Sequence, residues 1–134
     1  MTERLTSGVH HVGLTVGDLE ASAGFFTEAL GFERVGGRPE YPSVFVSDGT
    51  VMLTLWQAKV DAPTPFDRTA NIGLHHLCLR IPDRATLDRA FERASSHPGV
   101  AVEFAPDTVA TGNGAYAMLY EPSGNRIELR FMEG

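Results

Sequence analysis

Hydrophobic and polar residues alternate in two segments that each begin with a histidine pair, residues 10–16 (HHVGLTV) and residues 75–81 (HHLCLRI). Alternation with a period of two is typical of a β-strand that has one buried face. Each segment is therefore predicted to form a strand.

A helix is predicted after each of these strands. Asp18 can cap a helix over residues 19–30, which Gly31 would end, and Asp83 can cap a second helix over residues 84–96. Hydrophobic stretches separated by turn residues predict further strands at residues 43–47, 51–56, 101–104, 115–120 and 125–131. Each half of the chain thus reads as βαβββ.

The two halves are related by an internal repeat. At an offset of 65 residues the identical pairs include His10 and His75, His11 and His76, Leu14 and Leu79, Asp18 and Asp83, Phe26 and Phe91, and Ala29 and Ala94. We predict an α+β fold of two tandem βαβββ modules in a single domain, residues 1–134. Module one covers about residues 8–58, a linker rich in Pro and Asp about 59–72, and module two about 73–133.

Composition narrows the class of protein. With 43% hydrophobic and 21% charged residues, the chain has the mixture of a folded globular domain. A net charge of -6 without a basic cluster argues against nucleic acid as a partner. The sequence has no membrane-spanning apolar run, residues 1–8 do not resemble a secretory signal, and Cys78 is the only cysteine. We therefore expect a cytoplasmic protein without a membrane partner.

The parity of strand positions selects three candidate metal ligands. His11, His76 and Glu128 each lie opposite the aliphatic face of their predicted strand. Two imidazoles and a carboxylate can bind one divalent ion, of Zn, Ni, Co, Fe or Mn, if the sheets bring them together. A single strand histidine is more often a hydrogen-bonded structural residue, but the repeat-equivalent positions of His11 and His76 favour the ligand interpretation. A β-bulge would exchange His76 for His75.

The sequence also resembles a known family. The segments HHVGLTVGDLEASAGFFTEALGF, LHHLCLRIPD and YEPSGNRIEL, which together touch both modules, resemble the vicinal oxygen chelate superfamily of glyoxalases, bleomycin-resistance proteins and extradiol dioxygenases. The resemblance implies open curved sheets around a metal cleft, and a homodimer in which His11 comes from one chain and His76 and Glu128 from the other. The second ligand position of that family falls on Thr54, which is a poor ligand for these metals.

Several functions are compatible with this resemblance. The first is a glyoxalase-like lyase or isomerase that acts on a small-molecule substrate through a metal-chelated enediolate, with Glu128 as the catalytic base. The second is an Fe(II) or Mn(II) extradiol-type dioxygenase, and the third is a ligand-binding dimer without catalysis, like the bleomycin-resistance proteins. Among the enzymatic interpretations fosfomycin resistance ranks third, because residues 112–116 lack the acidic cation-binding loop of those proteins and the sequence has no anion-binding cluster. Candidate substrate-binding residues are Thr54, Trp56, Tyr116 and Met118, and Phe66 is a further candidate pocket residue.

Overall fold

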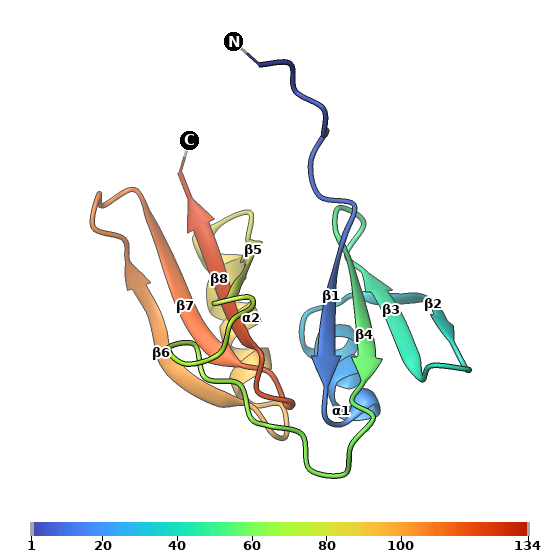
Figure 1. Ribbon diagram of the computed structural model, residues 1–134. Coiled ribbons are helices and arrows are strands. Elements are labelled where there is room, and N and C mark those ends of the chain that lie inside the picture. Colours follow the sequence, from blue (N-terminus) through green and yellow to red (C-terminus); the bar gives the residue numbers. More distant parts are fainter. Residues whose placement is uncertain (1, 134) are drawn as a thin grey trace.

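The computed structural model describes residues 2–133 and contains two four-stranded sheets. The first sheet has the strand order β1-β4-β3-β2, with β1 (His11–Val16), β2 (Glu33–Arg38), β3 (Ser43–Ser47) and β4 (Met52–Gln57). The second sheet has the equivalent order β5-β8-β7-β6, with β5 (Leu77–Arg80), β6 (Ala101–Thr108), β7 (Gly114–Tyr120) and β8 (Arg126–Met132). The sheets stand side by side as two open layers (Figure 1), so the predicted α+β fold of two βαβββ modules is confirmed.

The helices begin where the sequence places them. The Asp18 carboxylate accepts a hydrogen bond from the Ala21 amide at 3.0 Å and caps α1 (Leu19–Gly24). The Asp83 carboxylate accepts one from the Thr86 amide at 2.7 Å and caps α2 (Arg84–Ser95). These bonds satisfy amide groups that the first turn of a helix leaves without partners. Within residues 2–133, neither helix has the length and apolar character needed to cross a bilayer.

The first helix is not a regular α-helix to its predicted end. After Gly24 the chain widens into a π-helical turn, η1 (Phe25–Ala29). The neighbouring residues Phe25 and Phe26 are both fully buried, and their rings pack edge to face at 5.0 Å. A regular α-helix turns by about 100° per residue and would direct these two rings differently. The wider turn accommodates both rings in the core.

Two strands differ from the prediction. The hydrophobic pattern marks three of the four strands of module one, and the structure adds the fourth as β2, an edge strand whose residues are all exposed. Gly37 permits the pairing of β2 with β3, because a Cβ atom there would lie 2.5 Å from the carbonyl oxygen of Ser43. In module two, β6 continues past the predicted end at Phe104 to Thr108. Its Pro106 is tolerated because β6 is also an edge strand.

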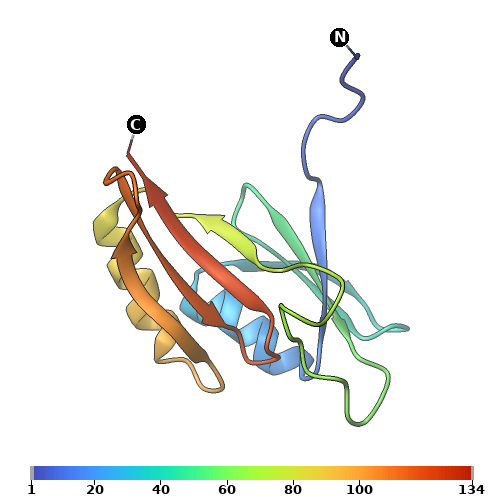
Figure 2. The same ribbon diagram turned by 60° about the vertical axis from the view of Figure 1, so that its left-hand side comes forward.

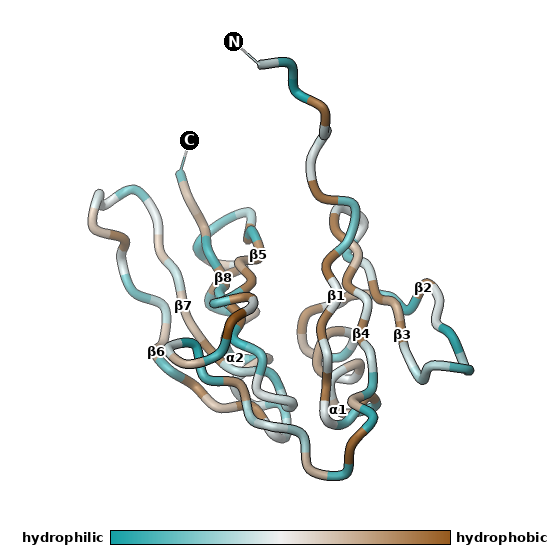
Figure 3. The backbone as a smooth tube through the Cα atoms, in the orientation of Figure 1, coloured by the Kyte–Doolittle hydropathy of each residue, from teal (hydrophilic) through white to brown (hydrophobic). Residues whose placement is uncertain are grey.

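A single hydrophobic core joins the two modules. The aliphatic faces of the strands are buried, and each helix packs on its own sheet. Hydrophobic residues, brown in Figure 3, occur in both modules. The helices also meet each other. The Phe25 and His97 rings are in edge contact at 5.8 Å, and the Arg93 guanidinium donates a hydrogen bond to the Glu28 carbonyl oxygen at 2.6 Å. Residues 58–76, which include the expected linker, form neither helix nor strand and cross between the sheets (Figures 1 and 2).

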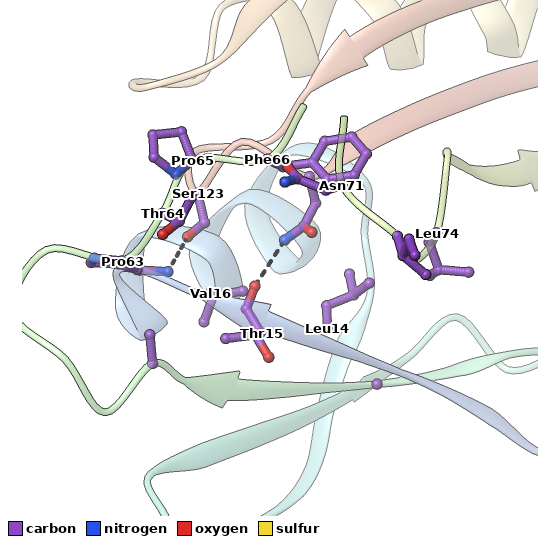
Figure 4. A pocket seen from close by; sticks show the side chains of 16 residues that line it. Leu14, Thr15, Val16, Pro63, Thr64, Pro65, Phe66, Asn71, Leu74 and Ser123 are labelled. Atoms are coloured by element: carbon purple, nitrogen blue, oxygen red, sulfur yellow. Dashed lines mark hydrogen bonds between the residues drawn. The ribbon is translucent and has the colours of Figure 1, made fainter. Parts of the chain in front are cut away.

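The turn between β7 and β8, residues 121–125, makes hydrogen bonds to the end of β1 and the start of α1. The Ser123 hydroxyl oxygen accepts a hydrogen bond from the Gly17 amide at 3.0 Å and lies 2.6 Å from the hydroxyl oxygen of the fully buried Ser22. Nearby, the Asn125 side-chain amide donates a hydrogen bond to the Thr15 carbonyl oxygen at 3.2 Å (Figure 4). The turn is therefore a polar connection beside the shared core.

Replacing Ser123 by alanine tests this connection. The variant leaves the fully buried Ser22 hydroxyl without a partner, and a buried unpaired polar group costs about 1–3 kcal/mol of stability. We expect Ser123→Ala to lower the free energy of unfolding by that amount in urea denaturation. The matched variant Ser95→Ala, which removes a local hydrogen bond at the exposed end of α2, should change it by less than about 0.5 kcal/mol. Equal effects of the two substitutions would contradict the proposed connection.

Candidate metal centre

His76 and Glu128 lie next to each other at the start of adjacent strands. β5 runs parallel to β8, and in their register Cys78 pairs with Glu128, so His76 just before β5 lies beside the glutamate. The distance from His76 Nε2 to Glu128 Oε1 is 3.2 Å. The glutamate side chain is only 6% exposed, whereas the histidine side chain is 35% exposed and remains accessible from outside. The structure thus brings two of the three predicted ligands together.

His11 does not join this pair within one chain. It lies at the start of β1, on the edge of the other sheet, and is exposed. Nowhere in residues 2–133 do three or more His, Cys, Asp or Glu side chains cluster closely enough to hold a metal ion. Strand parity alone would allow all three ligands to meet within one chain. In the described residues they do not.

The spacing of His76 and Glu128 fits two ligands of one ion. Donor atoms that are each about 2.1 Å from a divalent metal, at the bond angles of octahedral or tetrahedral sites, lie about 3.0–3.4 Å apart. The 3.2 Å between Nε2 and Oε1 falls within this range. An imidazole and a carboxylate also form a donor set that suits Zn, Ni, Co, Fe and Mn. The pair can accept a metal without a change in its spacing.

The second carboxylate oxygen of Glu128 is held by an arginine. Arg130 Nε donates a hydrogen bond to Glu128 Oε2 at 2.5 Å, and the guanidinium carbon lies 4.6 Å from the centre of the Tyr116 ring. Stacking on the ring and pairing with the carboxylate both limit the motion of Arg130. Oε2 is thereby occupied, and Oε1 remains directed at His76.

A partly buried ion pair supports the neighbouring histidine. Arg126 donates two parallel hydrogen bonds to the Glu103 carboxylate, each 2.9 Å long, and a third to His75 Nδ1 at 3.2 Å. The Arg126 side chain is only 7% exposed. Its hydrogen bonds, with a smaller contribution from the Tyr120 hydroxyl, lower the pKa of Glu103 from 4.5 to about 2. The sequence pattern does not single out Glu103, and Arg126 looks in it like a surface arginine that could attract a carboxylate. The position of Arg126 two residues before Glu128 is the available signal.

In module one, Thr54 and Trp56 occupy the positions of Glu128 and Arg130. Thr54 pairs with Gly13 as Glu128 pairs with Cys78. The Thr54 hydroxyl oxygen accepts a hydrogen bond from Trp56 Nε1 at 2.9 Å, just as the Glu128 carboxylate accepts one from Arg130. Thr54 thus stands where the second module has Glu128, and it cannot supply a carboxylate there.

The four predicted substrate-binding residues divide between the two sheets. Tyr116 and Met118 lie on β7, directly opposite Arg130 and Glu128 of β8. Thr54 and Trp56 lie on β4 in the other sheet, where the Trp56 ring contacts the Tyr41 ring at 5.0 Å. Only Tyr116 and Met118 are therefore neighbours of the His76 and Glu128 pair within the chain.

A cleft of about 490 Å³ lies at the junction of the modules, between β1, the linker and the turn after β7 (Figure 4). Phe66 lines this cleft. The three candidate ligands and the four candidate substrate-binding residues do not line it. This cleft is therefore separate from the candidate metal centre.

The low pKa of Glu103 has a consequence for stability. A carboxyl whose pKa is lowered on folding adds stability that is complete above its unfolded value of 4.5 and is lost as the pH falls toward 2. We expect Glu103→Gln to reduce the free energy of unfolding by about 2 kcal/mol at neutral pH, and by much less near pH 3. Urea denaturation at both pH values measures the difference. The control Glu92→Gln, on the exposed side of α2, should show no such pH dependence.

Comparisons with known proteins agree with this architecture. The sequence matches the family model of the Glyoxalase/Bleomycin resistance protein/Dioxygenase superfamily over residues 8–129. A glyoxylase/bleomycin resistance protein/dioxygenase domain from Frankia sp. EAN1pec has a solved structure that superposes with a TM-score of 0.82 at 25% sequence identity, covering 96% of this chain and 99% of that one.

Two relatives have named activities. A 2-epi-5-epi-valiolone epimerase from Actinomyces sp is 29% identical over 144 residues, which cover 90% of this chain and 77% of the relative. Catechol-2,3-dioxygenase from Bacillus subtilis (strain 168) is 29% identical over 99 residues, covering 71% of this chain and 33% of the relative, so the chain spans about a third of that enzyme. The match over residues 8–129 and the shared fold establish that the chain belongs to the Glyoxalase/Bleomycin resistance protein/Dioxygenase superfamily.

Proposed function

We propose that the protein is a divalent-metal-dependent enzyme that acts as an isomerase or lyase on a small-molecule substrate. The ligands would be His11, His76 and Glu128, and the observation that carries the proposal is the 3.2 Å between His76 Nε2 and Glu128 Oε1. A bound divalent ion supplies Lewis acidity toward two neighbouring oxygens of a substrate. This chemistry assists the removal of a proton from the carbon beside a carbonyl group.

The proposal requires a second copy of the chain. His11 is exposed on the edge strand of one sheet, whereas the His76 and Glu128 pair belongs to the other sheet of the same chain. In a two-fold symmetric dimer, the first sheet of one chain can face the second sheet of its partner, and each dimer then has two equivalent sites. Each chain would contribute His11 to one site and His76 with Glu128 to the other.

The residues around Glu128 suit it for proton transfer. Arg130 fixes Oε2 and leaves Oε1 as the oxygen that binds the ion or accepts a proton. A positioned base of this kind contributes about 10²- to 10⁴-fold to the rate. Thr54 would act differently, because its oxygen already accepts a hydrogen bond from Trp56 and its proton remains free to be donated. Thr54 can therefore orient a substrate oxygen by donating a hydrogen bond to it, and it leaves that oxygen in place as the metal ligand.

The extent of the two sequence matches favours an isomerase over a dioxygenase. The match to the epimerase covers 77% of that protein, whereas the match to the dioxygenase covers 33% of it. The second candidate remains an Fe(II) or Mn(II) dioxygenase, since the catechol-2,3-dioxygenase has the same identity over the matched segment. The two differ in their need for oxygen and in the metal that supports activity.

Metal content tests the ligand set and its assembly together. The wild-type protein should bind about one Zn(II) or Co(II) per chain. We expect weaker binding, by more than about 100-fold, in each of the variants His11→Ala, His76→Ala and Glu128→Gln. Even the loss of a hydrogen-bond partner of a ligand changes metal affinity by about 10- to 100-fold, and the loss of a ligand itself should cost more. Glu92→Gln is the control and should bind as the wild type does. Full metal content in all three ligand variants would overturn the site.

Mixed dimers distinguish a shared site from one within a chain. A dimer of one His11→Ala chain and one His76→Ala chain contains one intact site if the site is shared, because both substitutions fall in the other site. Random exchange of equal amounts should therefore restore about a quarter of the wild-type metal content. A site formed within one chain predicts no recovery, since every chain lacks one ligand.

The reaction type can be tested without knowing the natural substrate. We expect the protein loaded with Co(II) or Ni(II) to catalyse exchange of deuterium from solvent into small 2-hydroxy ketones under argon, as an isomerase does when its base removes the adjacent proton. Glu128→Gln should slow this exchange by about 10²- to 10⁴-fold. The measurement is proton NMR with a parallel oxygen-electrode assay on catechol. Oxygen uptake with Fe(II), and no exchange, would favour the dioxygenase.

A further inference from the structure

We propose that His75 and Arg126 are positioning residues that hold His76 in the tautomer required for a metal ligand. Arg126 makes His75 Nδ1 a hydrogen-bond acceptor, His75 in turn holds a proton on His76 Nδ1, and His76 Nε2 is left with its lone pair directed at Glu128. This inference rests on the proposed function, because it assigns the role of residues beside the proposed metal centre.

The first step follows from the chemistry of arginine. A guanidinium group has five N–H donors and no acceptor. Arg126 Nη1 lies 3.2 Å from His75 Nδ1, so in this contact His75 Nδ1 is the acceptor. The orientation of the Arg126 guanidinium group is fixed, because two further hydrogen bonds of 2.9 Å hold it on the Glu103 carboxylate and its side chain is only 7% exposed.

The second step concerns the two neighbouring imidazoles. His75 Nδ1 and His76 Nδ1 are 2.8 Å apart, and one of them must donate. Because His75 Nδ1 already accepts from Arg126, the proton of this hydrogen bond belongs to His76 Nδ1, and the two donors share the single lone pair of His75 Nδ1. A neutral imidazole carries one N–H, so His76 Nε2 then has a lone pair.

The third step concerns two acceptor atoms that face each other, His76 Nε2 and Glu128 Oε1. With its proton on Nδ1, His76 directs the lone pair of Nε2 at Glu128 Oε1 over 3.2 Å. Two acceptors at this distance repel each other unless a cation lies between them. Ligand histidines commonly donate their other ring N–H to a fixed partner, which sets both tautomer and orientation. The arrangement of Arg126, His75 and His76 supplies this partner before a metal binds.

The first module provides an internal comparison. His10 Nδ1 and His11 Nδ1 are also 2.8 Å apart, so the histidine pair itself is repeated. The residue paired with His11 on β4 is Met52, whose side chain has no N–H to donate, whereas the β8 residue at the equivalent position is Arg126. The donor that fixes the tautomer is therefore a property of the second module alone.

Two substitutions of His75 separate hydrogen bonding from packing. In His75→Asn the side-chain amide oxygen can accept near the position of Nδ1, whereas His75→Phe keeps a ring and removes the acceptor. Affinity for Co(II) is measured by visible absorption titration of the full-length protein, with urea denaturation to show that each variant is folded. We expect His75→Phe to bind Co(II) about 10- to 100-fold more weakly and His75→Asn to bind within about threefold of the wild type.

Arg126→Met should weaken Co(II) binding in the same direction as His75→Phe. Its matched control is Arg84→Met, which removes an arginine paired with Asp88 on the surface of α2 and should leave the affinity unchanged. Proton NMR of the Co(II) protein adds a direct measure of the tautomer. The wild type should show a shifted, exchangeable ring N–H signal from His76 that is lost to solvent exchange in His75→Phe.

Each outcome bears on a specific step. Equal Co(II) affinity and an unchanged N–H signal in His75→Phe would overturn the inference while leaving the proposed metal centre intact. Equal losses in His75→Asn and His75→Phe would show that the ring packs there without acting as an acceptor, and would also overturn it. Failure of the wild-type protein to bind Co(II) would contradict the proposed function itself, and the inference would fall with it.

Discussion

The packing of both helices into one hydrophobic core is the constraint on which the rest of the structure depends. Residues such as Leu14 in β1 and Leu129 in β8 must face the helices, so the residues that alternate with them are directed to the opposite side of each sheet. His11 and Glu128 lie on that opposite side. Because the helices of the two modules contact each other and the two sheets stand beside one another, their polar faces do not close around a common site within the described chain. The burial of the aliphatic strand faces thus determines which side of each sheet carries the candidate site residues.

Much of this fold could be predicted from the sequence because it depends on local patterns. Alternation identified the strands, and Asp18 and Asp83 identified the helix starts, since both features need only neighbouring residues. β2 was not located, because all of its residues are exposed and two of them are glycines, so no hydrophobic alternation marks it. The π-helical turn also has no local signal. It results from the burial of Phe25 and Phe26 against residues of the rest of the core.

The candidate site could be predicted only in part, for a related reason. Strand parity selected His76 and Glu128, and the parallel pairing of β5 with β8 places them 3.2 Å apart. The supporting residues depend on the register of strands that are distant in sequence. Glu103 on β6 reaches Arg126 on β8 across β7, and it lies at a register shift of β6 that the sequence does not indicate. Arg130 and Arg126 look like surface arginines in the sequence, but both are paired with carboxylates in the structure.

The divergence of the two modules explains why a shared site would need both. Where the second module has Glu128, Arg130 and Arg126, the first has Thr54, Trp56 and Met52. One outer face therefore carries a carboxylate and two guanidinium groups, and the other carries a histidine, a hydroxyl group and aromatic rings around Trp56. If both modules had a glutamate, a metal site built from His11 and His76 would contain two carboxylates. The metal would then have one fewer open coordination position for substrate oxygens. Thr54 would leave that position open, and the aromatic rings beside it form an apolar surface.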